Sequence, residues 1–146
     1  MKLSKEIRNG LLIFFGIAIY FLLMQALGLS DNYVLRFLNI FIVYFGVYKT
    51  LKSNFNEGKL GYIDNLISVG FTAINGIVLS FIGLILYIYA NGGQSFLNHL
   101  SPGFIFSGNP SVSEYCFGLL FEGLASAVII VFISMQYWRA KMAFND

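Results

Sequence analysis

Long apolar stretches alternate with short polar joints along this chain. Four apolar runs cover residues 11–29, 33–48, 63–90 and 112–138. A helix needs about 20 mostly apolar residues to cross a hydrocarbon core about 30 Å thick. Three runs reach that length, and the second reaches it if Lys49 and Lys52 extend their ammonium groups to the interface. The pattern predicts an all-α membrane protein with four transmembrane helices.

The joints between the runs set the expected ends of the helices. Glycine, aspartate and asparagine break the chain at residues 28–32, and a polar loop covers residues 53–61. The first connections are short, so consecutive helices are expected to be antiparallel neighbours. We predict an antiparallel bundle in a single domain, residues 1–146, with helices at about 7–28, 32–51, 62–90 and 113–139.

The largest joint is an outer loop, residues 91–112. It holds both prolines and several apolar side chains, among them Phe96, Leu97 and Phe104. So many apolar residues in an outer loop indicate that it lies on the membrane surface. The alternative is a lid that closes over a site between the helices.

Composition supports the membrane assignment. Hydrophobic residues make up 58% of the chain and charged residues 11%, whereas an average soluble domain carries about 25% charged residues. The lipid bilayer is therefore the predicted partner of the apolar surface. The first run resembles a signal peptide, but Ala26-Leu27-Gly28 is a poor cleavage site. We expect this run to be retained as a helix.

The basic residues are distributed very unevenly between the two ends of the predicted helices. Eight of the nine flank one side, and only Arg36 falls near the other. The eight are Lys2, Lys5, Arg8, Lys49, Lys52, Lys59, Arg139 and Lys141. The positive-inside rule then places both termini in the cytoplasm. The net charge of +2 is too small to indicate nucleic-acid binding.

Small and polar residues line one face of each of the last two runs, whereas the first two runs are mostly plain apolar spans. Residues four apart lie on one helix face, and small residues let helices approach closely inside a membrane. These faces are therefore predicted to pack against other helices. They comprise Ser68, Thr72, Gly76, Ser80 and Gly83 in the third run and Gly118, Gly123 and Ser126 in the fourth.

Glu122 is the main candidate for a functional residue. It lies about ten residues into the fourth run, roughly 15 Å deep at 1.5 Å per residue. A charge at the centre of a membrane costs about 3 kcal/mol on insertion scales, so the group needs a partner or a function. We predict that Asn75 is its partner. Arg36 is the alternative, and Asn39 lies one turn deeper in the same run.

Other chemistry is not indicated. The single histidine, His99, is expected to be a loop residue, and the single cysteine, Cys116, a small packing residue. No phosphate loop, metal-ligand spacing or cofactor motif is recognisable. Small four-helix membrane enzymes that conjugate glutathione are an alternative, since Arg36 and Asn39 match part of their motif. The second run has no carboxylate after Asp31, so we predict no catalytic residue, no bound metal and no cofactor.

Two segments resemble the small membrane proteins of the domain of unknown function 4199 family. One is FGVYKTLKSNFNEGKLGYIDNLISVGFTAINGIVLS, in which a basic helix end and a short loop lead into the small, polar face. The other is the tail FEGLASAVIIVFISMQYWRAKM. The resemblance covers residues 40–142. It implies a four-helix protein of the bacterial inner membrane, with no established activity and no site residues.

Two functional hypotheses follow. The first is a non-enzymatic structural or accessory protein that packs with itself, as a homo-oligomer, or with a larger membrane complex. The second is a small ion- or proton-coupled transporter or channel that uses Glu122 and Asn75 near the midplane. A small-residue face buried against another chain favours the first hypothesis, and a cavity that reaches Glu122 favours the second.

Overall fold

A computed structural model describes residues 4–30, 32–100 and 108–143 of the chain, and in these residues all regular secondary structure is helical. The elements are α1 (Lys5–Ala26), α2 (Tyr33–Arg36), α3 (Asn39–Asn56), α4 (Tyr62–Ala90), α5 (Gln94–Leu100) and α6 (Val112–Ala143). Four stretches are long and apolar enough to cross a membrane: Lys5–Ala26, Val34–Asn56, Tyr62–Ala90 and Val112–Lys141. The sequence predicted an all-α protein with four transmembrane helices, and the structure confirms four helices of the required length and hydropathy.

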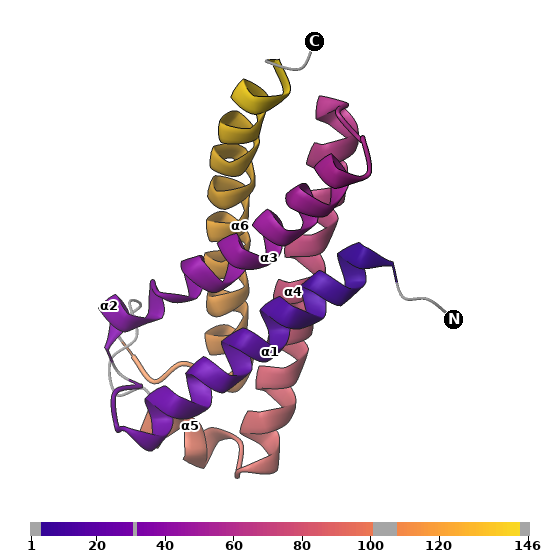
Figure 1. The fold of residues 1–146 in the computed structure, drawn as a ribbon. Coiled ribbons are helices and arrows are strands. Elements are labelled where there is room, and N and C mark those ends of the chain that lie inside the picture. The colour runs from indigo at the N-terminus through magenta and orange to yellow at the C-terminus, as the bar shows by residue number, and fades with distance from the viewer. Residues whose placement is uncertain (1–3, 31, 101–107, 144–146) are drawn as a thin grey trace.

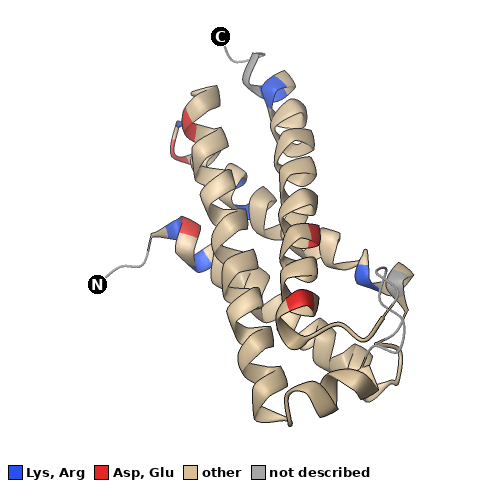
Figure 2. Cartoon of the chain, turned by 180° about the vertical axis from the view of Figure 1, so that it is seen from behind, with Lys and Arg blue, Asp and Glu red and all other residues tan. Residues whose placement is uncertain are grey.

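The four long helices lie in two layers (Figure 1). α4 and α6 run side by side in opposite directions, and α1 and α3 cross obliquely over them. The view from behind shows the same order, with α4 and α6 in front (Figure 2). This crossing brings α1 against α4 along part of its length.

The observed helix ends follow local capping chemistry. Ser4 caps α1, because its Oγ accepts a hydrogen bond from the amide of Ile7 at 3.4 Å. α1 stops at Ala26, two residues before the predicted end. Gly28 follows with φ of +67°, a conformation that glycine adopts at no steric cost. The amide of Leu29 then bonds to the carbonyl of Met24 at 2.9 Å and closes the helix end.

The structure differs from the sequence prediction in two further places. The second apolar run, expected as one helix at 32–51, is divided into α2 and α3, and α3 continues to Asn56. The outer loop contains a short helix, α5, whose Leu97 and Leu100 are buried. Residues 101–107, on which part of the surface-loop and lid hypotheses rested, lie outside the described residues.

α1 packs closely against α4. A Cβ atom on Gly76 would lie 2.6 Å from Cβ of Ile13 and 3.1 Å from the carbonyl oxygen of Gly10. A Cβ atom on Gly10 would lie 3.0 Å from Cβ of Asn75. Further out, Gly83 faces the ring of Phe14. The small face of α4 is therefore occupied by a helix of the same chain.

The core forms around this contact. Ile13 of α1 is fully buried, and Gly123 of α6 packs on Ile77 of α4. The buried apolar side chains come from all four long helices: Ile13, Val43, Val47, Leu51, Val69, Ala73, Ile77, Ala127, Ile130, Val131, Met135 and Trp138. Small residues of α4 and α6, such as Gly76 and Gly123, thus allow the four long helices to pack around one hydrophobic core.

A buried polar cluster lies beside the core, and it includes residues from the runs that the sequence analysis had taken as plain. Asn9 of α1 donates to the hydroxyl of Thr50 of α3 at 2.9 Å, and Thr50 lies 3.0 Å from the hydroxyl of Thr72. Nearby, Ser68 of α4 donates to the carboxylate of Glu6 at 2.8 Å. The expectation of plain first and second helices is therefore wrong, because single polar residues in them meet partners on α4.

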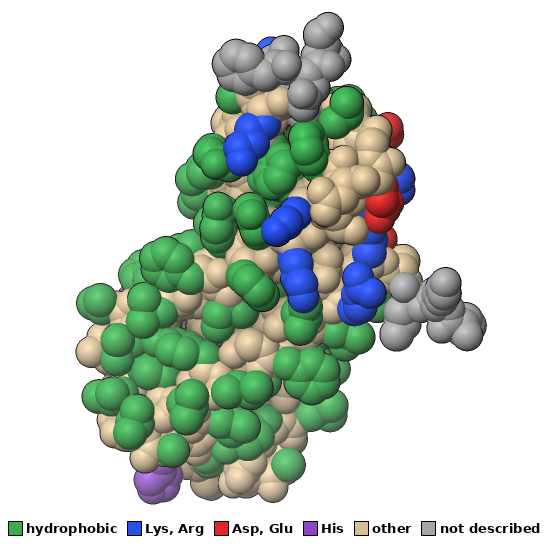
Figure 3. Space-filling view, viewed as in Figure 1, with side chains coloured by type: hydrophobic (Ala, Val, Ile, Leu, Met, Phe, Trp, Pro, Cys, Tyr) green, Lys and Arg blue, Asp and Glu red, His purple; other side chains and the backbone are tan. Residues whose placement is uncertain are grey.

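Most charged side chains lie at one end of the helices. Figure 3 shows the Lys, Arg, Asp and Glu side chains of one face in its upper part, among hydrophobic side chains that also cover the lower part. Lys5 of α1 forms an ion pair with Glu57 in the loop after α3 at 2.6 Å, and Lys59 lies 3.4 Å from the same carboxylate. The loop is thereby attached to the start of α1.

Substitution of Gly76 with alanine tests the α1–α4 contact. The added methyl group meets Ile13 and the Gly10 carbonyl, so Gly76→Ala is expected to destabilise the fold by about 1–3 kcal/mol. The measurement is unfolding in mixed micelles. Gly70→Ala is the matched control, since nothing lies within 4 Å of a Cβ atom at that position of α4. Equal stability of the two variants would contradict the contact.

The ion pair of Lys5 predicts a pH effect. The Lys5 ammonium, with a hydrogen bond from Ser53, lowers the pKa of the Glu57 carboxyl. Because this pKa is lower in the folded chain than in the unfolded chain, the ion pair stabilises the fold at pH values above the ordinary pKa of a glutamate. This stabilisation is lost as the pH falls through the lowered pKa of Glu57. We expect Lys5→Ala to raise the pKa of Glu57, measured by carbon NMR of the carboxyl, whereas Lys52→Ala leaves it unchanged.

Candidate functional site

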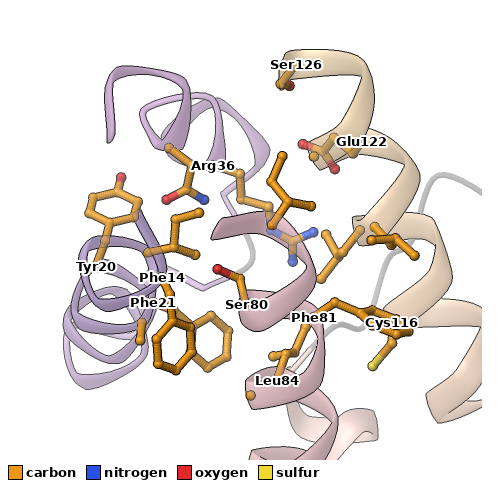
Figure 4. Close-up of a pocket in the computed structure, with 18 of the residues that line it drawn as sticks. Phe14, Tyr20, Phe21, Arg36, Ser80, Phe81, Leu84, Cys116, Glu122 and Ser126 are labelled. Carbon is orange, nitrogen blue, oxygen red and sulfur yellow. The ribbon is translucent and has the colours of Figure 1, made fainter. Parts of the chain in front are cut away.

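The half of the structure at the C-terminal end of α1 contains a cavity of about 270 Å³ between the two helix layers (Figure 4). Most of its wall is apolar, and much of it is aromatic. The side chains that carry polar groups are Tyr20, Ser30, Arg36, Asn39, Ser80, Tyr87, Tyr115, Cys116, Glu122 and Ser126. Three of the four predicted site residues, Arg36, Asn39 and Glu122, therefore line one cavity, although they come from three different elements.

The break between α2 and α3 lies directly at this cavity. Here the backbone bonds span three residues instead of four: the amide of Leu38 bonds to the carbonyl of Leu35, and that of Ile40 to Phe37. The turn is tightened in the manner of a 3₁₀ helix. Arg36 precedes the break and Asn39 follows it, so the tightened turn determines how both side chains meet the cavity wall.

Tyr20 of α1 supports the break. Its hydroxyl donates to the carbonyl oxygen of Leu35 at 2.7 Å. A backbone carbonyl within a membrane needs such a partner, because lipid offers none. α1 therefore holds the end of α2 against the cavity.

Arg36 forms part of the wall and bridges two elements. Its Nη2 donates to the carbonyl oxygen of Ser30 and to the hydroxyl of Tyr115 of α6, both at 3.2 Å. The guanidinium carbon also lies 5.8 Å from the centre of the Tyr115 ring, within the range of a cation–π contact. In Figure 4 the guanidinium reaches toward the middle of the cavity.

Glu122 lies across the cavity from the α2 segment. Its side chain is exposed, and it makes no hydrogen bond or ion pair with any residue that the structure describes. Asn75, its predicted partner, lies elsewhere: its amide donates to the carbonyl of Phe71 at 2.7 Å, and its Cβ faces Gly10 of α1. The predicted pairing of Glu122 with Asn75 is therefore not made, because Asn75 lies on the face of α4 that α1 covers.

The other polar groups of the wall are used in different ways. Ser80 donates to the carbonyl of Gly76 at 2.8 Å within α4. Asn39 has a buried amide oxygen without a hydrogen-bond partner. Ser126, one turn beyond Glu122, completes the polar edge on α6. Gly118 is half-buried.

The aromatic part of the wall was not anticipated. Phe14, Tyr20 and Phe21 of α1 and Phe81 of α4 line the cavity, and Tyr87 meets Phe21 edge to face at 5.8 Å between ring centres. In the sequence these residues resemble lipid-facing or interfacial aromatics. No sequence signal separates the two roles, since the oblique crossing of α1 decides which rings turn inward.

The described residues contain no group of three or more histidine, cysteine, aspartate or glutamate side chains placed to hold a metal ion. His99 is exposed on α5, with Nδ1 2.7 Å from the carbonyl oxygen of Ser95. Cys116 is buried in the cavity wall.

A second hollow, of about 420 Å³, lies where α1 begins, α3 ends and α4 begins. Its wall mixes polar and apolar side chains and carries both signs of charge, from Glu6, Lys59 and Asp64. Asn54, also in this wall, has a buried amide oxygen without a hydrogen-bond partner.

Comparisons with protein-family models, curated proteins and solved structures found no match to this chain. The resemblance to the domain of unknown function 4199 family therefore stays an expectation. The chemistry of the cavity must be argued from its own residues.

Replacing Tyr20 with phenylalanine tests the support of the helix break. Tyr20→Phe leaves the Leu35 carbonyl without its side-chain donor, so we expect a loss of roughly 1 kcal/mol in unfolding free energy. Tyr89→Phe is the control, because Tyr89 is exposed and makes no side-chain hydrogen bond with the described residues. Indistinguishable unfolding of the two variants would remove this role for Tyr20.

Proposed function

We propose that the chain is a small, non-enzymatic membrane transporter whose substrate site is the cavity at Glu122. The topology we propose with it is an antiparallel four-span bundle with both termini in the cytoplasm. The eight-to-one distribution of Lys and Arg supports this orientation. The family resemblance adds the expectation of a bacterial inner membrane.

The observation that carries the proposal is the state of Glu122. It lies roughly 15 Å along α6 from the outer end of that helix, and it has no hydrogen bond or ion pair with the described residues. A carboxylate that served only to hold helices together would bond to a neighbour. An ionisable group without such a bond, at the edge of a cavity within a membrane span, is typical of an ion or proton pathway.

The broken second span supports the same function. Transporters commonly form their substrate sites from discontinuous helices near the midplane, where backbone and side chains at the break face the substrate. Here the break between α2 and α3 places Arg36 and Asn39 at the cavity wall.

The two hollows suggest how access alternates. The cavity at Glu122 lies in the outer half, and the polar hollow with Glu6 and Asp64 lies at the inner end. Between them stands the close contact of Gly10, Ile13 and Gly76. We propose that movement of α1 against α4 at this contact exposes the two sides in turn.

Self-association is a second candidate that one observation favours. The side chain of Glu122 is exposed in the single chain, and exposure of a charge to lipid costs about 3 kcal/mol on insertion scales. A second copy that covers the cavity mouth removes this cost. The small face of α4 no longer argues for an external partner, because α1 occupies it.

Purified protein in liposomes tests the transport function. We impose a pH gradient across the membrane, with Na⁺, K⁺ or tetramethylammonium on the side opposite the protons. We expect protons to move down this gradient faster than in empty liposomes. Glu122→Gln removes the charge and should abolish this flux. Glu114→Gln is the matched control on the same helix, because Glu114 only accepts hydrogen bonds from Ser111 at the helix start, and glutamine still accepts them.

Flux in Glu122→Gln at the wild-type rate would reject Glu122 as the site. Wild-type flux at the level of empty liposomes, with every cation tried, would reject transport altogether. If the wild type and both variants are then dimers of defined mass in mild detergent, this result favours the self-associating accessory protein.

A further inference from the structure

We propose that the cavity binds an organic cation, a substituted ammonium ion with a small apolar body, in preference to an inorganic ion. This inference rests on the proposed function, since it uses the same cavity. It specifies the chemistry of the ligand, which the transport proposal leaves open.

The charge of the ligand follows from Glu122. It is the only acidic side chain in the described wall of the cavity. Because the surrounding wall is mostly apolar, an opposite charge attracts it more strongly than in water. A ligand with an ammonium group supplies this opposite charge.

Arg36 determines where the cation sits. Its guanidinium extends from α2 and is bonded to the carbonyl of Ser30 and to the hydroxyl of Tyr115 of α6. Like charges repel, so a bound cation is held away from this guanidinium, next to Glu122. The rest of the ligand then extends toward α1 and α4.

The walls on α1 and α4 suit an organic cation. They present the rings of Phe14, Tyr20, Phe21 and Phe81 (Figure 4). These rings bury an apolar body. One carboxylate and several rings therefore match the two parts of the ligand.

The cavity suits an inorganic cation poorly. An alkali ion leaves water only where a ring of oxygen atoms replaces its hydration shell. The side-chain oxygens of this wall are few against its apolar lining, and they come from several elements, among them Tyr20 of α1, Ser80 of α4 and Glu122 of α6.

The size of the cavity limits the ligand. Pockets for drug-sized molecules occupy about 300–1,000 Å³, and this cavity of about 270 Å³ lies just below that range. A single ring with a trimethylammonium group is the kind of molecule that fits. Benzyltrimethylammonium is therefore the probe of choice, and neopentylbenzene is its neutral isostere.

Binding to purified full-length protein in detergent tests the inference by equilibrium dialysis. We expect saturable binding of benzyltrimethylammonium and at least about tenfold weaker binding of neopentylbenzene, a ratio that corresponds to about 1.4 kcal/mol. Glu122→Gln should weaken binding of the cation about tenfold and leave the neutral isostere unaffected. Glu122→Asp keeps the charge and should retain binding, and Glu114→Gln should match the wild type.

Three results would overturn the inference. Equal binding of the cation and its isostere, or equal binding to wild type and Glu122→Gln, would mean that the cavity is merely apolar. Absence of cation binding in protein that transports Na⁺, K⁺ or protons would reject the organic cation and leave the transport function standing. Absence of both binding and flux would reject the two proposals together.

Discussion

The arrangement depends on the close approach of α1 and α4 at Gly10, Ile13 and Gly76. Lipid removes the hydrophobic advantage of burying one apolar side chain against another, so helices in a membrane associate through van der Waals packing and hydrogen bonds. Both need short distances between backbones, which glycine allows. The contact brings the turn of α1 that carries Asn9 to Thr50 of α3, which lies beside Thr72. Packing and polar bonding therefore reinforce each other in the inner half.

Large side chains line the cavity further along the same two helices. Small residues face each other near Gly76, whereas Phe21 and Tyr87 meet as rings nearer the C-terminal ends of α1 and α4. Tyr87 also donates to the side chain of Gln25 at 2.8 Å, which ties these ends of the helices together. The rings of α1 and α4 therefore form much of the cavity wall.

Much of the fold could be predicted from the pattern of apolar runs, and the site only in part. The helix at 62–90 was placed at its observed ends, because Gly61 and Asn91 flank an uninterrupted apolar run. The division of the second run was missed, since no proline or glycine marks Phe37 and Leu38. The sequence singled out Glu122, Arg36 and Asn39 as polar groups within apolar runs, and all three line one cavity. It misplaced Asn75, because residue depth says nothing about which face a neighbour covers.

The sequence by itself determined the physical setting: four helices long and apolar enough to span a membrane, with basic residues biased to one side. Length and hydropathy are local properties, and they can be read residue by residue. Only the tertiary structure decided that the small face of α4 meets α1, that Asn9 finds Thr50, and that the rings of α1 line a cavity with Glu122. These facts depend on the oblique crossing of two helix layers, which is set by contacts between residues far apart in the chain.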